Sequence, residues 1–207
     1  MTLKKIHASC VSIAISVILL SACATPVVER YYRLTYASNA VQAAESSEPK
    51  YELVVNQVQI PESINRPQMV LQKSPTESLV KDAQRWVAPL DEQITHAMVA
   101  HLRIALPESW LTESTESKAS LPRFLLKTQI EKLLINAPGQ VELEATWHVM
   151  DANRKVLGRQ HKTIFLPLAS NDYEAIAAGV SEAVRLLSLS VVQDISAVQN
   201  KKESVKH

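Results

Sequence analysis

Residues 141–150 read Val-Glu-Leu-Glu-Ala-Thr-Trp-His-Val-Met, and this stretch decides the fold class. Apolar side chains occupy every second position and polar side chains occupy the positions between them. Strict alternation over this length predicts a β-strand with one buried face and one solvated face. Trp147 falls on the apolar register, so we expect it in the core.

The segments on either side predict two further strands. Residues 124–134 place four side chains on one face, namely Phe124, Leu126, Thr128 and Ile130. Turns at residues 136–139 and 151–154 join this strand to residue 141 and lead on into residues 156–166. Three strands joined by short turns predict an antiparallel meander with one apolar face.

Two helices are predicted outside the meander. The first begins at Pro89, whose missing N–H is tolerated in a first turn, and stops at Pro107. The second begins near Asn171 and Glu174, which are spaced as in a capping box. Its apolar stripe consists of Ile176, Val180, Ala183, Val184, Leu187, Val191, Ile195 and Val198. Both helices need an apolar surface to cover, so we predict a two-layer α+β domain, an antiparallel sheet with two amphipathic helices packed on one face.

The rest of the chain divides around this domain, which we place at residues 51–198. Residues 51–60 and 69–71 predict short strands, and residues 31–36 are rich in strand-forming side chains. We interpret residues 107–121 as a polar loop and residues 37–49 as a flexible one. A lipidated linker with a short strand covers residues 23–50, and residues 199–207 form a charged tail that we expect to fray.

The amino-terminal residues 1–22 have the pattern of a secretory signal peptide. Lys4 and Lys5 precede an apolar stretch, residues 6–20, that is too short to span a bilayer. The following Leu-Ser-Ala-Cys, ending at Cys23, resembles the lipobox of bacterial prolipoproteins. That resemblance implies cleavage before Cys23, a diacylglycerol thioether on its sulfur and an acyl group such as palmitate on its amine. A plain signal peptide with a chance cysteine is the alternative.

The composition of the mature chain restricts its partners and its chemistry. Removing residues 1–22 leaves 20 basic and 21 acidic side chains, and this balance argues against nucleic acid as a partner. Cys10 leaves with the signal and Cys23 is the predicted lipid attachment site. The mature domain then has no free thiol, so its core alone must stabilise the fold.

Motifs for catalysis are missing from the sequence. With only three glycines, the chain has no Gly-rich phosphate loop. His96 and His101 are five residues apart on one helix, which splays them too far for a metal site. Glu142 and Glu144 share the solvated face of their strand. We therefore predict no catalytic residue, no metal site and no cofactor other than the covalent lipid, and we expect that the protein is not an enzyme.

Several motifs together resemble a known family, the ABC-type transport auxiliary lipoproteins. They are Arg66-Pro67-Gln68, then Arg85-Trp86 followed by Pro89-Leu90-Asp91-Glu92, with Tyr31-Tyr32-Arg33-Leu34 close behind the lipobox. The resemblance implies a non-enzymatic lipoprotein on the periplasmic face of the outer membrane. Ala24, which follows Cys23 where an aspartate would stand in a lipoprotein retained elsewhere, implies the same location by resemblance to lipoprotein sorting signals. It implies as partners a periplasmic MCE-domain protein and its inner-membrane permease, in intermembrane lipid transport, and a homo-oligomer.

The resemblance makes Arg66, Pro67, Gln68, Arg85 and Trp86 candidate partner contacts. A structural role is the other interpretation: Pro67 starts a strand, Trp86 packs in the core, and Arg85 pairs with Asp91 or Glu92. A second functional hypothesis is an assembly or regulatory lipoprotein for a cell-wall synthase or an outer-membrane protein.

Overall fold

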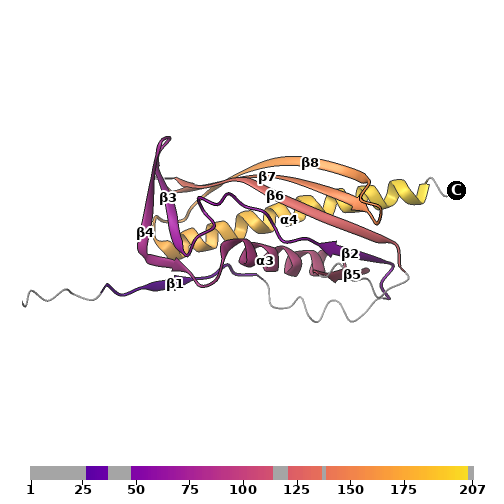
Figure 1. Ribbon diagram of the computed structural model, residues 1–207, viewed down its shortest axis with the longest axis horizontal. Coiled ribbons are helices and arrows are strands. Elements are labelled where there is room, and N and C mark those ends of the chain that lie inside the picture. The colour runs from indigo at the N-terminus through magenta and orange to yellow at the C-terminus, as the bar shows by residue number, and fades with distance from the viewer. Residues whose placement is uncertain (1–26, 37–47, 114–120, 137–138, 205–207) are drawn as a thin grey trace, which may run out of the picture.

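The computed structural model describes residues 27–36, 48–113, 121–136 and 139–204. The predicted signal peptide and Cys23 lie outside the described residues. The elements, in chain order, are β1 (Arg30–Tyr32), β2 (Tyr51–Val55), β3 (Gln68–Ser74), β4 (Glu77–Trp86), α3 (Leu90–Ala105), β5 (Ser109–Thr112), β6 (Arg123–Asn136), β7 (Gln140–Asp151), β8 (Val156–Pro167) and α4 (Tyr173–Ser204). Figure 1 shows β1 near one end of the domain and the carboxyl end of α4 at the other.

The predicted meander is confirmed. β6 pairs with β7, and β7 with β8, both antiparallel, with Thr128 opposite Trp147 and Trp147 opposite Gln160. The predicted inward side chains are buried: Phe124, Leu126, Thr128 and Ile130 on β6, and Trp147, only 2% exposed, on β7. After Ile130 the ladder shifts register at Glu131, so Leu133 and Ile135 take over the buried face.

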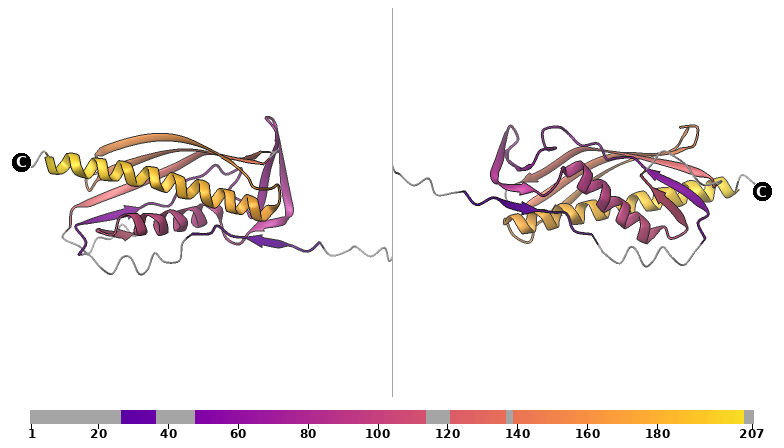
Figure 2. Two further views of the ribbon diagram at one scale, coloured as in Figure 1. Left: turned by 180° about the vertical axis from the view of Figure 1, so that it is seen from behind. Right: turned by 60° about the horizontal axis from the view of Figure 1, so that its bottom comes forward.

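Helix α4 packs along this meander. It contacts β7, β8 and helix α3, and Figure 2 (left) shows it running beside the long strands. A Cβ on Gly179 would lie 3.3 Å from the Val141 Cγ2, so this glycine permits a close approach of α4 to β7. By length and composition α4 would suffice to span a membrane, but 56% of that apolar window is buried inside the domain. Its hydropathy is therefore that of a core helix.

Both ends of α4 differ from the prediction. The capping side chain is Asp172 rather than Asn171, because the Asp172 Oδ1 accepts the N–H of Ala175 at 2.8 Å. This contact holds the pKa of the Asp172 carboxyl below its usual value, together with a hydrogen bond from Ser170, which is the larger cause. At the other end the helix continues to Ser204, so the first part of the predicted frayed tail is helical.

The α+β class is confirmed, but the predicted antiparallel sheet is wrong, because the eight strands form a mixed sheet. The strand order is β1-β4-β3-β6-β2-β5, with β7 and β8 continuing from β6. β1 runs parallel to β4, β2 runs parallel to both β5 and β6, and β3 meets β6 in a parallel pair. Alternation within a strand indicates which face is buried, but it does not specify which distant strand lies alongside.

Strand β5 was also missed, since residues 107–121 were predicted as a polar loop. Ser109–Thr112 instead extends the sheet beside β2, with Tyr51 opposite Ser109. Between β5 and β6, every residue of β2 is buried, including Glu52, which is 1% exposed. The Arg123 Nε lies 3.3 Å from the Glu52 Oε2, and this ion pair offsets part of the cost of burying the carboxylate.

Candidate partner-binding site

The structure brings four of the five motif residues together, at the start of β3 and the end of β4. They are Pro67, Gln68, Arg85 and Trp86. Gln68 lies opposite Arg85 in the ladder, and the Pro67 carbonyl accepts the Trp86 N–H at 2.7 Å. Strand β1 joins from the other side, with Tyr31 opposite Arg85. Two motifs far apart in the sequence are therefore adjacent at one edge of the sheet, near the amino-terminal end of the domain (Figure 1).

Trp86 has a structural role at this place. It is 4% exposed and belongs to the hydrophobic core, directly before the turn into α3. The Gln93 side chain fixes the same turn, because its Nε2 donates to the Ala88 carbonyl at 2.8 Å and its Oε1 accepts the Leu34 N–H at 3.0 Å. Burial of this kind favours packing over direct contact with another protein.

Arg85 does not pair with Asp91 or Glu92, so that expectation is wrong. Its Nη1 lies 3.4 Å from the Glu29 Oε1, and its Nε donates to the Asp82 carbonyl at 3.2 Å. The Asp91 carboxylate instead accepts the Gln57 Nε2–H at 2.8 Å. Arg85 thus connects β4 to the segment before β1, a partner that lies far away in sequence.

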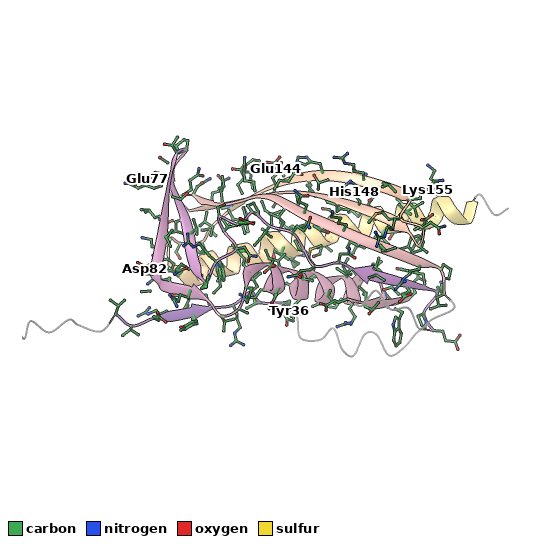
Figure 3. The ribbon with its side chains drawn as sticks, in the orientation of Figure 1. Tyr36, Glu77, Asp82, Glu144, His148 and Lys155 are labelled. Carbon is green, nitrogen blue, oxygen red and sulfur yellow. The ribbon has the colours of Figure 1, made fainter. Side chains whose placement is uncertain are left out.

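Arg66 directly precedes Pro67 in the chain. It is exposed and lines a cavity of about 250 Å³ between the β3–β4 hairpin and β6, together with Val70, Val80 and Leu134. Figure 3 shows this hairpin standing out from the sheet, with Glu77 at its tip and Asp82 lower on β4. The five motif residues thus differ in accessibility, since Arg66 is exposed whereas Trp86 is buried.

Exposed apolar side chains near Arg85 were missed by the sequence analysis. They form what we call the β1–β4 patch: Val27, Val28, Tyr31 and Val87, with 73%, 74%, 58% and 48% exposure. Tyr31 and Tyr32 illustrate the local rule, since Tyr32 turns inward and lies 6.0 Å from the Tyr173 ring while Tyr31 turns outward. The sequence indicated strand-forming side chains in this segment, but it did not indicate which side of β1 would face solvent.

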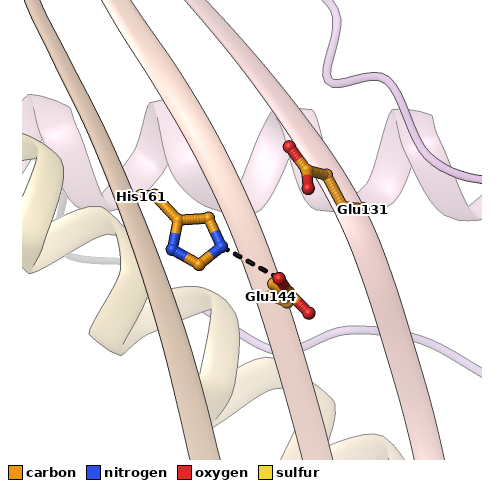
Figure 4. A group of neighbouring side chains, drawn as sticks. All are labelled: Glu131, Glu144 and His161. Atoms are coloured by element: carbon orange, nitrogen blue, oxygen red, sulfur yellow. Dashed lines mark hydrogen bonds and ion pairs between the residues drawn. The ribbon is translucent and has the colours of Figure 1, made fainter.

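A cluster of two carboxylates and a histidine lies on the outer face of the meander, the face opposite to the one that packs against the core. Glu131, Glu144 and His161 come from three neighbouring strands, and their ligand atoms lie within 4.8 Å of one another (Figure 4). The His161 Nε2 is 3.0 Å from the Glu144 Oε1, which holds the pKa of the Glu144 carboxyl below its usual value. Nitrogen and carboxylate donors suit zinc. However, the Lys132 Nζ is 3.6 Å from Glu144 and would repel a cation.

A groove of about 530 Å³ separates α3 from α4. Tyr36, Ile104 and Leu189 contribute apolar surface, and an ion pair between Glu182 and Arg185 lies along one side. His101 lines the groove from α3. Burial, with the nearby Arg185 guanidinium as a smaller cause, lowers the pKa of the His101 imidazole.

These features define an α+β protein with an exposed apolar patch at the end of the sheet that carries the β1 strand. The chain belongs to the family of ABC-type transport auxiliary lipoprotein components, whose family model matches residues 32–192. It is 27% identical over 103 residues to the intermembrane transport lipoprotein PqiC of Escherichia coli, an alignment that covers 49% of this chain and 54% of the relative. PqiC of Shigella flexneri matches to the same extent. The chain thus aligns with about half the length of these curated relatives.

Two solved structures share the fold. A crystal structure of an uncharacterized protein superposes with a TM-score of 0.68 at 17% identity, covering 80% of this chain and 97% of the other. Protein XCC0632 from Xanthomonas campestris gives a TM-score of 0.65 at 16% identity, covering 84% of this chain and 99% of the other. At these identities the likeness concerns the fold alone.

Proposed function

We propose that this protein is an outer-membrane lipoprotein, anchored through lipid on Cys23, that docks a periplasmic MCE-type assembly in intermembrane lipid transport. In this role it binds and positions, and it catalyses no reaction. The family match over residues 32–192 carries the proposal, because it extends from the last residue of β1 to the middle of α4. The similarity to PqiC, named as an intermembrane transport lipoprotein, supports the same role.

The covalent chain links the proposed anchor to one end of the domain. Val27 is four positions after Cys23, and a fully extended chain reaches about 3.6 Å per residue, so the Val27 Cα stays within about 15 Å of the Cys23 Cα. Three acyl chains would hold this end at the membrane surface, since each buried CH₂ contributes about 0.8 kcal/mol. β1 and the β1–β4 patch then form the membrane-proximal part of the domain.

The β1–β4 patch is the surface we assign to the MCE-domain partner. An assembly that exchanges lipid with the outer membrane must reach the membrane-proximal end of its docking protein. Exposed apolar side chains around a half-buried charge, here Arg85 with Glu29, match the composition of a protein–protein interface. The proposal also includes three further points. Both amphipathic helices pack on one face of the sheet. Several copies of the lipoprotein assemble around the MCE-domain partner, and the inner-membrane permease lies at the other end of the transport system.

Affinity capture of the tagged, lipidated chain from gently solubilised envelopes tests the proposal. Two variants make a matched pair, because Val87, which follows β4, and Val156, which begins β8, are almost equally exposed, at 48% and 51%. We expect an MCE-domain protein to be recovered with the unchanged chain and with Val156→Asp. Val87→Asp should lower the recovery at least about tenfold, as expected when a charge replaces an interface side chain.

Circular dichroism and thermal unfolding of both variants control for folding. Recovery of a cell-wall synthase or an outer-membrane barrel protein, with no MCE-domain protein under any crosslinking condition, would contradict the proposal. Equal recovery with Val87→Asp and Val156→Asp would leave the docking role in place and exclude the β1–β4 patch as its surface.

A further inference from the structure

A polar groove of about 320 Å³ lies between the edge strand β8 and helix α4, away from the β1–β4 patch. Trp147 from β7, Gln160 and Lys162 from β8, and Ser190 and Asp194 from α4 line it. Figure 2 (left) shows the two elements that form its walls, with α4 lying along β8. His161 of the carboxylate cluster also lines the groove, whereas the five residues named here belong to none of the surfaces described above.

Trp147 contributes an unused hydrogen-bond donor. The residue is 2% exposed, and its indole Nε1 has no acceptor among the residues that the structure describes. A buried N–H without an acceptor costs about 1–3 kcal/mol, and a buried tryptophan usually finds a partner for this group.

Asp194 contributes an unused acceptor in the same groove. Its Oδ1 accepts a long hydrogen bond of 3.4 Å from the Gln160 Nε2, while its buried Oδ2 has no donor in the described part of the chain. Gly158 makes room for this carboxylate, since a Cβ there would lie 3.0 Å from the Oδ2. Gln160 is also the direct cross-strand neighbour of Trp147, which places donor and acceptor close to each other.

Lys162 adds a positive charge that is held in place. Its Nζ donates to the Ser190 Oγ at 2.7 Å, and it forms no ion pair with Asp194 or any other described carboxylate. The Lys162 ammonium and the Asp194 carboxylate line one groove without forming an ion pair. They leave space for a ligand that has a negative group to face Lys162 and a positive group to face Asp194. A ligand with only one charge would leave either Lys162 or Asp194 uncompensated.

We propose that this groove binds a compact zwitterion of the ethanolamine-phosphate type. Its anionic oxygens accept hydrogen bonds from the Trp147 indole and the Lys162 ammonium, and its ammonium donates to the Asp194 carboxylate. Charge-assisted hydrogen bonds of this kind are roughly twice as strong as neutral ones. The groove volume is sufficient for a group of this size, and the open side toward solvent leaves room for a chain attached to the phosphate.

This chemistry has two sources, a phospholipid headgroup and a free soluble compound. The preference for the headgroup rests on the proposed function, since a protein in a lipid-transport system meets membrane lipid. Recognition of the zwitterion itself rests on the groove alone.

Nuclear magnetic resonance of the ¹⁵N-labelled full chain in detergent tests the proposal directly. The three tryptophans give three indole N–H signals, and Trp147→Phe assigns the one of interest. The probes are O-phosphoethanolamine, inorganic phosphate, and micelles of short-chain phosphatidylethanolamine or phosphatidylglycerol. We expect O-phosphoethanolamine and phosphatidylethanolamine to shift the Trp147 signal saturably, with the Trp86 and Trp110 signals unmoved as a control for folding.

Two variants separate the charges. Asp194→Asn and Lys162→Met should each weaken the saturable shift at least about tenfold, which corresponds to about 1.4 kcal/mol. Lys127→Met, a change of an exposed lysine on β6, should leave the shift unchanged. A shift with the lipid alone identifies a membrane headgroup as the source, and a shift with the soluble compound alone identifies a free ligand.

The proposal is overturned if no ethanolamine-phosphate probe moves the Trp147 signal, or if inorganic phosphate moves it equally in the unchanged chain and in Asp194→Asn. Failure here is distinguishable from failure of the docking role. Capture of the MCE-domain partner depends on Val87, whereas the indole shift depends on Asp194 and is measured without any partner.

Discussion

The β6–β7 pair and the β1–β4 pair are built from opposite kinds of contact. β6 and β7 follow each other in sequence and run antiparallel from Phe124 opposite Asp151 to Asn136 opposite Gln140. β1 and β4 run parallel, touch only over the three residues Arg30–Tyr32, and are separated by β2 and β3 along the chain. The first pair closes a short turn at little entropic cost, whereas the second depends on anchors that bring distant segments together.

The anchors of the β1–β4 region are few and specific. Trp86 is buried in the core. The Gln93 side chain forms hydrogen bonds both with the turn before α3 and with the segment after β1. The Thr35 N–H donates to the Ser181 Oγ at 2.9 Å. Loss of one anchor should therefore destabilise the β1–β4 region more than loss of one contact destabilises the meander. In the meander, many neighbouring residue pairs stabilise the same two strands.

The largest effect should come from Trp86→Ala. Removing this buried ring leaves a cavity under β1, β4 and the start of α3, and we expect a loss of about 3–5 kcal/mol in the free energy of unfolding. Urea denaturation followed by circular dichroism measures it. Val80→Ala is the control on the same strand, since Val80 is 40% exposed and should cost less than about 0.5 kcal/mol. Equal costs for the two variants would show that Trp86 is no anchor.

The Arg123–Glu52 and Arg85–Glu29 pairs should differ by a smaller amount. Arg123→Met removes the guanidinium 3.3 Å from the Glu52 carboxylate, which is 1% exposed, and we expect a loss of about 3 kcal/mol. Arg85→Met breaks the more exposed pair with Glu29 and should cost less than about 1 kcal/mol. Thermal unfolding of both variants at one salt concentration gives the comparison, and a larger loss for Arg85→Met would reverse it.

A turn variant should test the meander. Gly139 has φ +72°, a backbone conformation that side chains with a Cβ rarely adopt, and its added Cβ would lie 2.9 Å from the Asn171 Oδ1. Gly139→Ala should therefore cost about 1 kcal/mol in unfolding free energy, with the register of β6 and β7 retained. Hydrogen exchange of the strand amides would show that register, and a lost or shifted β6–β7 ladder would contradict a locally determined meander.

The smallest effect should be a pH dependence between α3 and α4. Because burial and Arg185 lower the pKa of the folded His101, the unfolded chain binds a proton at a higher pH than the folded chain. Stability from this group is therefore present above the unfolded value of 6.5 and is lost as the pH falls through the folded pKa. His101→Gln should make the decline in melting temperature from about pH 7.5 to 5 shallower. An unchanged slope with His101→Gln would exclude this cause.

The sequence alone predicts those features of the fold that depend on contacts within one segment or between consecutive segments. The meander, both helices, the buried side of β7 and the core position of Trp147 follow from periodicity within single segments. The mixed sheet and strand β5 do not, because neither parallel pairing nor the neighbour of β2 is encoded by alternation. Arg85 was assigned the wrong partner for the same reason, since Glu29 comes close only through the parallel pairing of β1 with β4.

The candidate surfaces divide in the same way. Pro67, Gln68, Arg85 and Trp86 were recognised as motifs, but their separation into a buried anchor and a half-buried ion pair needed the structure. Glu131 meets Glu144 and His161 through the pairing of β6 with β7 and of β7 with β8, which the sequence alone does not specify. The groove at Trp147 was likewise hidden, because a tryptophan on an apolar register gives no sign of an unpartnered N–H.

Photo-crosslinking from single positions in living envelopes tests the docking claim most directly. A photoreactive amino acid at Tyr31 lies in the β1–β4 patch, whereas the same group at His148, which Figure 3 places on the meander, reports on a surface away from that patch. We predict that the probe at position 31 captures an MCE-domain protein and that the probe at position 148 does not. Capture of a cell-wall synthase or barrel protein at position 31, or capture of the MCE-domain protein at position 148 alone, would contradict the account.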